Sequence, residues 1–158
     1  MGPSIEIEVL LLSERDGCLN YRAVREILPA FVHPDDAARQ LAGLTTCTSG
    51  GLLHSTSWRP VSGGIVLTYA AVPDLHPERG ATPVQVDAMA CAGHPLAPSP
   101  EHVELDAVAA HACRHLALLQ QTDEQVMCAA TQLPAFWQLI AKLLPGTAGA
   151  LTPVRLGG

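Results

Sequence analysis

The chain is poor in aromatic residues and in charge. Aromatic side chains make up 4% and charged ones 15% of its 158 residues, whereas 48% of the residues are hydrophobic. Disordered chains have the opposite balance, so the composition predicts a folded protein whose core is built from Leu, Val and Ala. The length suits one domain with a single core, because two domains of half this size would each be marginally stable.

Basic residues are also scarce. Nine Lys and Arg stand against fifteen Asp and Glu, for a net charge of -6, and the basic residues do not gather in one segment. Nucleic acids and anionic membranes would be repelled by such a surface. We therefore expect neither nucleic acid nor membrane as a partner.

Long apolar runs and clustered cysteines are missing as well. No apolar run reaches the roughly 18 residues that span a bilayer, and the opening MGPSIEIEVLLLSE lacks the basic region of a signal peptide. The five cysteines are far apart and form no C-x-x-C pair, which excludes the common zinc-knuckle and redox motifs. The sequence predicts a soluble cytoplasmic protein with free thiols, no metal and no cofactor.

Alternating apolar residues in the first half of the chain predict strands. The pattern runs from Ile5 to Leu12 and ends at the turn Asp16-Gly17. Two further β-rich runs flank Ser62-Gly63-Gly64, whose glycines can adopt the positive φ angles of a tight turn, so residues 52–72 are predicted to form a β-hairpin. Residues 83–89 alternate again and predict another short strand.

Helical spacing and capping residues predict the remaining elements. A capping box at Thr122–Gln125 opens one helix, and prolines stand at the first positions of two others. The predicted helices are 21–28, 34–42, 101–121, one from 122 onward, and 134–144. Strands followed by a helical block indicate an α+β fold, with an antiparallel sheet of about four strands and helices packed on one face. We expect one domain over residues 1–145 and a flexible C-terminal tail over 146–158.

The hairpin carries the first group of candidate site residues. With a two-residue turn and regular pairing, His54 shares a face with Trp58, and the opposite face carries Ser55, Ser57 and Arg59; a three-residue loop would exchange the two faces. The hydroxyls and the guanidinium would form a patch able to hold a carboxylate or phosphate through a fork-shaped Arg59 contact.

The helix around residues 111–115 carries the second group. His111 and His115 are four positions apart, so both rings can point the same way, and Arg114 lies further out on the helix. That spacing is found in helical metal sites, but Ala112 occupies the position of the glutamate in H-E-x-x-H, and a third ligand would have to come from elsewhere.

Three functions fit these residues. The first is a module that binds a small anionic molecule or a protein partner at a His/Arg cluster; the second is a hydrolytic enzyme that uses His54, His111 and His115 as acid and base or as metal ligands. The third is an assembly subunit without a pocket, such as a homodimer formed through a sheet edge or the helix carrying Trp137. The candidate ligand-binding residues are His54, Ser55, Ser57, Arg59, His111, Arg114 and His115. A shared site requires that the hairpin and the helix meet in the fold.

Overall fold

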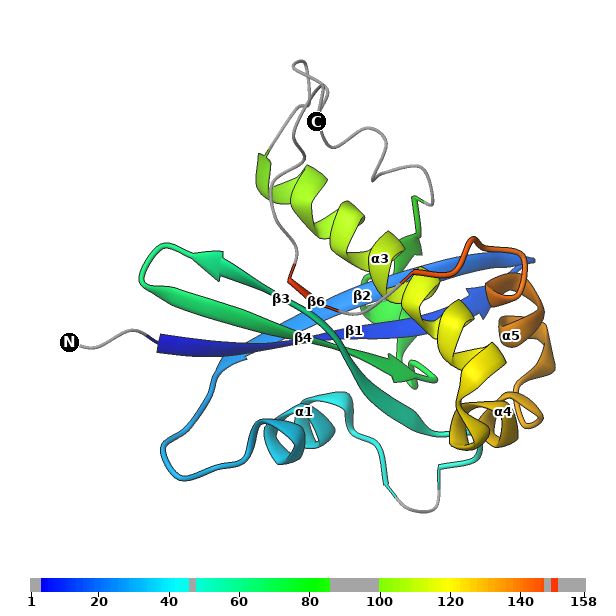
Figure 1. Ribbon diagram of the computed structural model, residues 1–158, viewed down its shortest axis with the longest axis horizontal. Coiled ribbons are helices and arrows are strands. Elements are labelled where there is room, and N and C mark those ends of the chain that lie inside the picture. The colour runs from blue at the N-terminus through cyan, green and yellow to red at the C-terminus, as the bar shows by residue number, and fades with distance from the viewer. Residues whose placement is uncertain (1–3, 46–47, 86–99, 147–148, 151–158) are drawn as a thin grey trace.

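The computed structural model describes residues 4–45, 48–85, 100–146 and 149–150. It has the predicted α+β architecture, with strands in the first half of the chain and helices mostly in the second (Figure 1). The elements are β1 (Ser4–Arg15), β2 (Cys18–Ile27), α1 (Pro34–Ala42), β3 (Leu52–Val61), β4 (Gly64–Val72), η1 (Pro77–Arg79), β5 (Thr82–Pro83), α3 (Pro100–Thr122), α4 (Glu124–Ala130), α5 (Pro134–Ile140) and β6 (Gly149–Ala150).

The segment predicted as a helix over 21–28 is a strand. β2 pairs antiparallel with β1 across a two-residue turn in which Asp16 has φ 53° and Gly17 has φ 78°. Asp-Gly is a preferred sequence for such a turn because both of its residues tolerate positive φ. The hairpin pairing buries Leu19 and Tyr21 with a period of two, and it overrides the helix-like spacing further along the segment.

The sheet is mixed, not purely antiparallel as predicted. Its strand order is β5-β2-β1-β4-β3-β6, and the central pair β1 and β4 runs parallel, from Ser4 opposite Gly64 to Leu11 opposite Ala71. The chain forms one hairpin, crosses over through α1, and returns as a second hairpin beside the first. At the start of the parallel pair the backbones are so close that a Cβ on Gly64 would lie 1.8 Å from the carbonyl oxygen of Ser4.

The second hairpin has the predicted two-residue turn, with Val61 opposite Gly64, but its pairing is not regular. The register shifts between Ser55 and Ser57, so that Thr56 is the extra residue of a β-bulge. The prediction of regular faces is therefore wrong for the residues before the bulge. His54 lies on the same face as Ser57 and Arg59, and Trp58 lies on the opposite face with Leu67.

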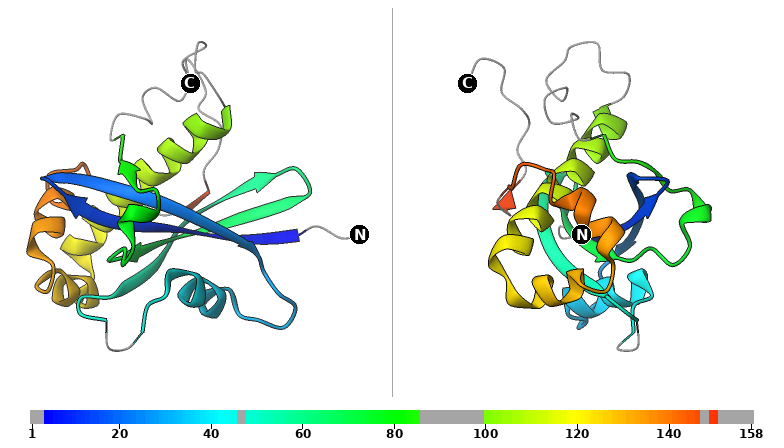
Figure 2. Two further views of the ribbon diagram at one scale, coloured as in Figure 1. Left: turned by 180° about the vertical axis from the view of Figure 1, so that it is seen from behind. Right: turned by 90° about the vertical axis from the view of Figure 1, so that its right-hand side faces the viewer.

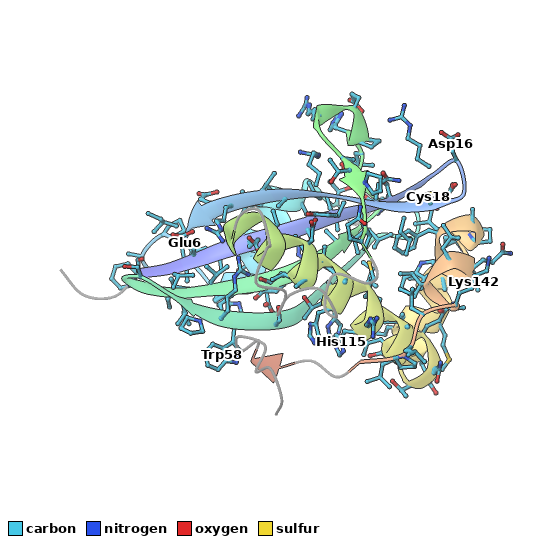
Figure 3. All side chains as sticks on the ribbon, turned by 90° about the horizontal axis from the view of Figure 1, so that it is seen from above. Glu6, Asp16, Cys18, Trp58, His115 and Lys142 are labelled. Atoms are coloured by element: carbon cyan, nitrogen blue, oxygen red, sulfur yellow. The ribbon has the colours of Figure 1, made fainter. Side chains whose placement is uncertain are left out.

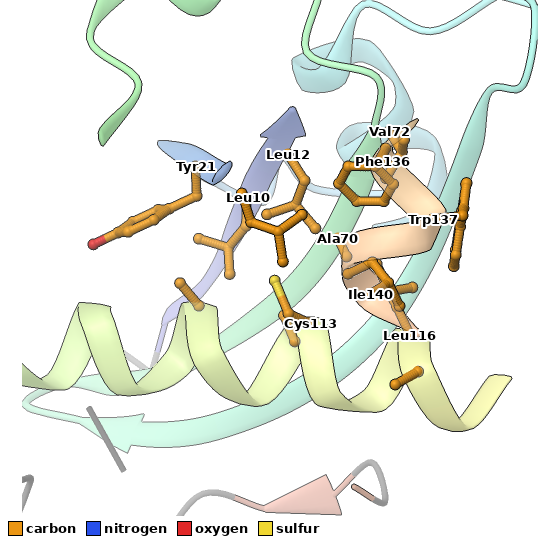
Figure 4. Packing of buried hydrophobic residues seen from close by; sticks show 14 of the residues in the cluster. Leu10, Leu12, Tyr21, Ala70, Val72, Cys113, Leu116, Phe136, Trp137 and Ile140 are labelled. Carbon is orange, nitrogen blue, oxygen red and sulfur yellow. The ribbon is translucent and has the colours of Figure 1, made fainter. Parts of the chain in front are cut away.

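Helices lie on both faces of the sheet (Figure 2). One face packs against α3 and α5, in a core that contains Leu10, Leu12, Cys113 and Trp137 (Figure 4). The other face packs against α1, which the prediction of helices on one face did not include. Trp137 is 1% exposed, so its ring belongs to the core and not to the outer surface of the helix that the sequence offered for a dimer contact.

The C-terminal helices begin near the predicted positions, and two of their ends differ from the prediction. Asp123, not Thr122, caps α4, accepting hydrogen bonds from the backbone of Gln125 and Val126. The helix predicted over 134–144 is α5, and it ends at Ile140. Among the described residues no helix has the length and hydropathy to cross a membrane.

Two predicted segments near the end of the chain are described only in part. Of the strand predicted over 83–89, the structure describes residues 83–85, and β5 itself covers only Thr82–Pro83. In the predicted tail, Gly149–Ala150 form β6, which pairs in parallel with Ser57 and Trp58 of β3. Residues 86–89, 147–148 and 151–158 lie outside the described residues.

Candidate functional site: a histidine pair between β3 and α3

The bulge at Thr56 brings His54 to the side of the sheet that α3 covers. Leu52 and His54 pair with Val72 and Ala70 of β4, whose side chains line the core beneath α3. Regular pairing would have placed the imidazole on the α1 side. The one-residue insertion thus determines which helix His54 meets.

His54 and His115 meet across the interface of β3 and α3. Their ring centroids are 5.4 Å apart and the ring planes are inclined by 62°, an edge-to-face arrangement. His115 is 5% exposed, whereas His54 is partly exposed. Figure 3 shows His115 on α3, where the helix crosses the sheet. The two rings, termed the histidine pair below, come from segments that are far apart in the sequence.

Backbone carbonyl groups fix the orientation of both rings. His54 Nδ1 lies 2.8 Å from the carbonyl oxygen of Ser55, and His115 Nδ1 lies 3.1 Å from that of Gly146. A carbonyl oxygen can only accept, so each Nδ1 carries the proton and donates it. In the neutral rings each Nε2 is then a hydrogen-bond acceptor with a free lone pair.

The His115 ring is held in its neutral form. Burial lowers the pKa of His115 below its ordinary value of 6.5, and the nearby His54 and His111 lower it further; the hydrogen bond to Gly146 opposes this shift. Burial disfavours the imidazolium because its charge loses hydration, and neighbouring imidazoles disfavour it by repulsion. His111 is itself 8% exposed, one turn earlier on α3.

Two buried polar atoms here have no partner among the described residues. They are Nε2 of His115 and Oγ of Ser57, the residue that follows the bulge. Ser57 is 5% exposed and points to the α3 side of the sheet, as His54 does. Most buried polar atoms in proteins are hydrogen-bonded, and exceptions are often functional.

Arg59, the predicted anion contact, is engaged elsewhere in the same layer. Its guanidinium donates from Nη1 to Glu8 Oε1 at 2.9 Å and from Nη2 to Glu8 Oε2 at 3.2 Å. Thr68 and Arg25 also donate to Glu8, at 3.0 and 3.2 Å. These four residues, Glu8, Arg25, Arg59 and Thr68, are termed the Glu8 cluster. Glu8 thus compensates the charge that the sequence assigned to a ligand.

The Glu8 carboxylate is held in its charged form. Burial acts to raise its pKa. The hydrogen bond and the charge of Arg59, helped by the charge of Arg25 and the hydrogen bond from Thr68, lower the pKa by more, so that it lies below its ordinary value of 4.5. Glu8 and Arg59 have side chains only 2% and 4% exposed, so the pair is a buried salt bridge. Arg25 also pairs with Glu6, Nη1 to Oε2 at 3.4 Å, so carboxylates accompany both arginines of this sheet face.

The remaining predicted site residues are placed differently. Ser55 is exposed and its side chain lies on the α1 face, opposite to His54, although its carbonyl oxygen accepts the His54 hydrogen bond. Arg114 is partly exposed, and its carbonyl oxygen accepts from the backbone of Gly146 at 2.9 Å. The structure thus brings together His54 and His115. Ser57 lies on the same face of β3 as His54, His111 lies one turn before His115 on α3, and the Ser55 side chain lies on the opposite face.

Sequence reasoning missed Glu8 and the segment around Gly146. Glu8 lies inside the alternating run from Ile5 to Leu12, and an acid that is buried in such a run needs a partner of opposite charge. Gly146 was assigned to the tail. Nothing in its sequence context indicated that its carbonyl oxygen would orient a histidine.

The described residues include no group of three or more His, Cys, Asp or Glu side chains placed to hold a metal ion. Comparison with protein-family models, curated proteins and solved structures finds no match. The chemistry of the histidine pair must therefore be argued from its own geometry.

Proposed function

We propose that this chain is a binding module for a small anionic ligand, held between β3 and α3 by the histidine pair, and that the rings take up protons as the anion binds. The observation that carries the proposal is the contact between two imidazoles whose Nδ1 atoms are already committed to carbonyl groups. Only the Nε2 atoms remain for a ligand.

The protonation state decides what those nitrogens can bind. In the neutral pair both Nε2 atoms are acceptors, which repel an anion. Protonation turns each into a charged N–H donor, and charge-assisted hydrogen bonds to an oxyanion are among the stronger ones in proteins. The buried Ser57 hydroxyl, which has no described partner, supports a further donor at the same face.

Repulsion between the rings couples the two events. Two imidazolium groups with centroids 5.4 Å apart destabilise each other unless a negative charge lies between them. An anion between the rings removes this repulsion, so proton uptake and anion binding favour one another. Because the Arg59 charge is compensated by Glu8, protons on the rings are the source of positive charge that this proposal uses.

Titration with inorganic phosphate at about pH 6 and about pH 8 tests the proposal. We expect tighter binding at the lower pH, by up to roughly tenfold per pH unit for each proton taken up. His54→Gln and His115→Gln should each abolish this binding. The matched control is His33→Gln, because His33 is exposed and precedes α1 on the opposite side of the sheet.

Three results would overturn the proposal: no phosphate binding at the lower pH, an affinity that does not change with pH, or equal affinities in the three variants. Proton uptake itself is measured by calorimetry with sulfate, which carries no titrating proton between pH 6 and 8, in buffers that differ in ionisation enthalpy. A binding heat that does not vary with the buffer would show that the rings stay neutral.

A hydrolytic function is the second candidate, and the neutral state of His115 favours it. A histidine with an available Nε2 lone pair is equipped to act as a general base. Release of nitrophenol from p-nitrophenyl phosphate, lost in His115→Gln and retained in His33→Gln, would support this alternative. Phosphate binding without any turnover would favour the binding module.

A further inference from the structure

An exposed aromatic ring projects from the turn before α1. Phe31 is 108% exposed, more than any other large hydrophobic residue described, and its backbone has φ 63°. Positive φ is uncommon for a bulky residue and costs conformational energy. The flanking Leu28 and Val32 pack on the core beneath α1, so the turn is anchored at both ends and presents Phe31 outward.

A hollow lies directly beside this ring. Its volume is about 470 Å³, and it lies between the turn and the outer side of α1. The lining residues are Phe31, Val32, His33, Asp36, Arg39, Gln40 and Leu44. Figure 1 shows α1 on the side of the sheet opposite to α3, at the edge of the molecule. A projecting ring and a hollow therefore lie side by side on one surface.

The charges on this surface can pair with the opposite charges on the same surface of a second copy. Asp36 lies in the first turn of α1 and Arg39 in its last turn, and both side chains are exposed. If a second α1 is laid antiparallel against the first about a two-fold axis, Asp36 of each copy faces Arg39 of the other. A two-fold contact requires such a surface, because the same patch must serve on both sides.

We infer that the Phe31 turn and the outer face of α1 form a two-fold contact between two copies of this chain, with Phe31 of each copy inserted in the hollow of the other. The ring leaves water on dimerisation, which is favourable in proportion to the apolar area it buries. Two reciprocal Asp36–Arg39 pairs set the antiparallel register. The contact lies on the opposite side of the sheet from the histidine pair, so it is independent of the proposed anion site.

Sedimentation velocity of the full chain, from low micromolar to submillimolar concentration, tests the contact. We expect a reversible dimer whose dissociation constant rises by at least about tenfold in Phe31→Ser. The matched control is Leu75→Ser, because Leu75 is a large hydrophobic residue with 49% exposure, in the segment after β4. Its dissociation constant should equal that of the unmodified chain.

Charge exchange gives a second test that does not depend on the ring. Asp36→Arg and Arg39→Asp should each weaken the dimer, and the double variant should restore it, because the exchanged charges again face opposite ones. A chain that is monomeric at every concentration, a dimer that Phe31→Ser leaves unchanged, or a double variant no better than the single ones would overturn the inference. Far-UV circular dichroism confirms that each variant is folded.

Discussion

The Glu8 cluster and the histidine pair lie on the same face of the sheet, but their polar atoms are satisfied to different degrees. Both carboxylate oxygens of Glu8 accept from basic or hydroxyl groups, and the ion pair is almost fully buried. In the histidine pair Nδ1 is bonded and Nε2 of His115 is buried without a described partner. The bonded Glu8 carboxylate fixes structure, whereas the Nε2 lone pair of His115 keeps binding capacity in reserve.

Removing Arg59 should have the largest effect, because it breaks the buried ion pair with Glu8. Arg59→Ala leaves the Glu8 charge buried with only Arg25 and Thr68, and we expect a loss of about 3–5 kcal/mol in the free energy of unfolding. Urea denaturation measures it. The control Arg15→Ala changes an exposed residue and should stay within about 0.5 kcal/mol. A loss below about 1 kcal/mol for Arg59→Ala would show that the Glu8 cluster contributes no more to the free energy of unfolding than the histidine pair does.

As the pH falls, the contribution of His115 to stability should change before that of Glu8. His115 has a folded pKa below 6.5, so the unfolded chain binds a proton first and stability begins to fall as the pH drops below that value. Glu8 has a folded pKa below 4.5, so its contribution is present above that value and is lost as the pH falls through the folded pKa.

Urea denaturation across this pH range separates the two contributions. His115→Gln should remove the first decline and keep the second. Glu8→Gln should remove the second decline, with a lower stability at neutral pH. A first decline that survives in His115→Gln would assign it to another group.

Replacing His115 by an apolar residue should cost far less than removing Arg59. His115→Leu loses the hydrogen bond to Gly146 but also removes the unpartnered Nε2, so we expect a change within about 1 kcal/mol. Thermal and urea denaturation measure it. A loss as large as that of Arg59→Ala would show that the histidine pair is as structural as the Glu8 cluster.

Cys113 should not react with thiol reagents in the native protein, and its reactivity reports whether α3 stays packed on the sheet. Burial raises the pKa of its thiol to about 12, and the residue is fully buried. In the native protein a thiol reagent should label the exposed Cys18 and Cys128 and leave Cys113 unmodified, as peptide mapping would show. Labelling of Cys113 without denaturant would indicate that α3 opens.

Local chemistry made much of the fold predictable. The conformational preferences of Gly and Pro were not overridden by tertiary contacts at three places. These are the turn at Ser62-Gly63, the start of α1 at Pro34 and the end of α1 at Gly43. The strand β2 was mispredicted because spacings of three and four outweighed the Asp16-Gly17 turn signal. The parallel pairing of β1 with β4 is a long-range choice, which no local pattern encodes.

The candidate site could be predicted only in outline. The candidate residues named from the sequence include His54 and His115, whose rings the fold places side by side. Their surroundings could not be read in advance, because one inserted residue, Thr56, sets the face of His54, and because the partner of Arg59 comes from a strand fifty residues earlier in the chain. Bulges and long-range ion pairs depend on the whole sheet.

The close approach of Gly64 to Ser4 has a consequence for how the protein folds. Each hairpin can form from neighbours in the sequence, but the seam between them joins segments that are distant along the chain, and such pairing is slow because a long loop must first close. The rate-limiting barrier is therefore expected to lie at the docking of two preformed hairpins. A Cβ at position 64 would lie 1.8 Å from the Ser4 carbonyl oxygen, so we expect a substitution of this glycine to slow that docking as well as to disturb the finished sheet.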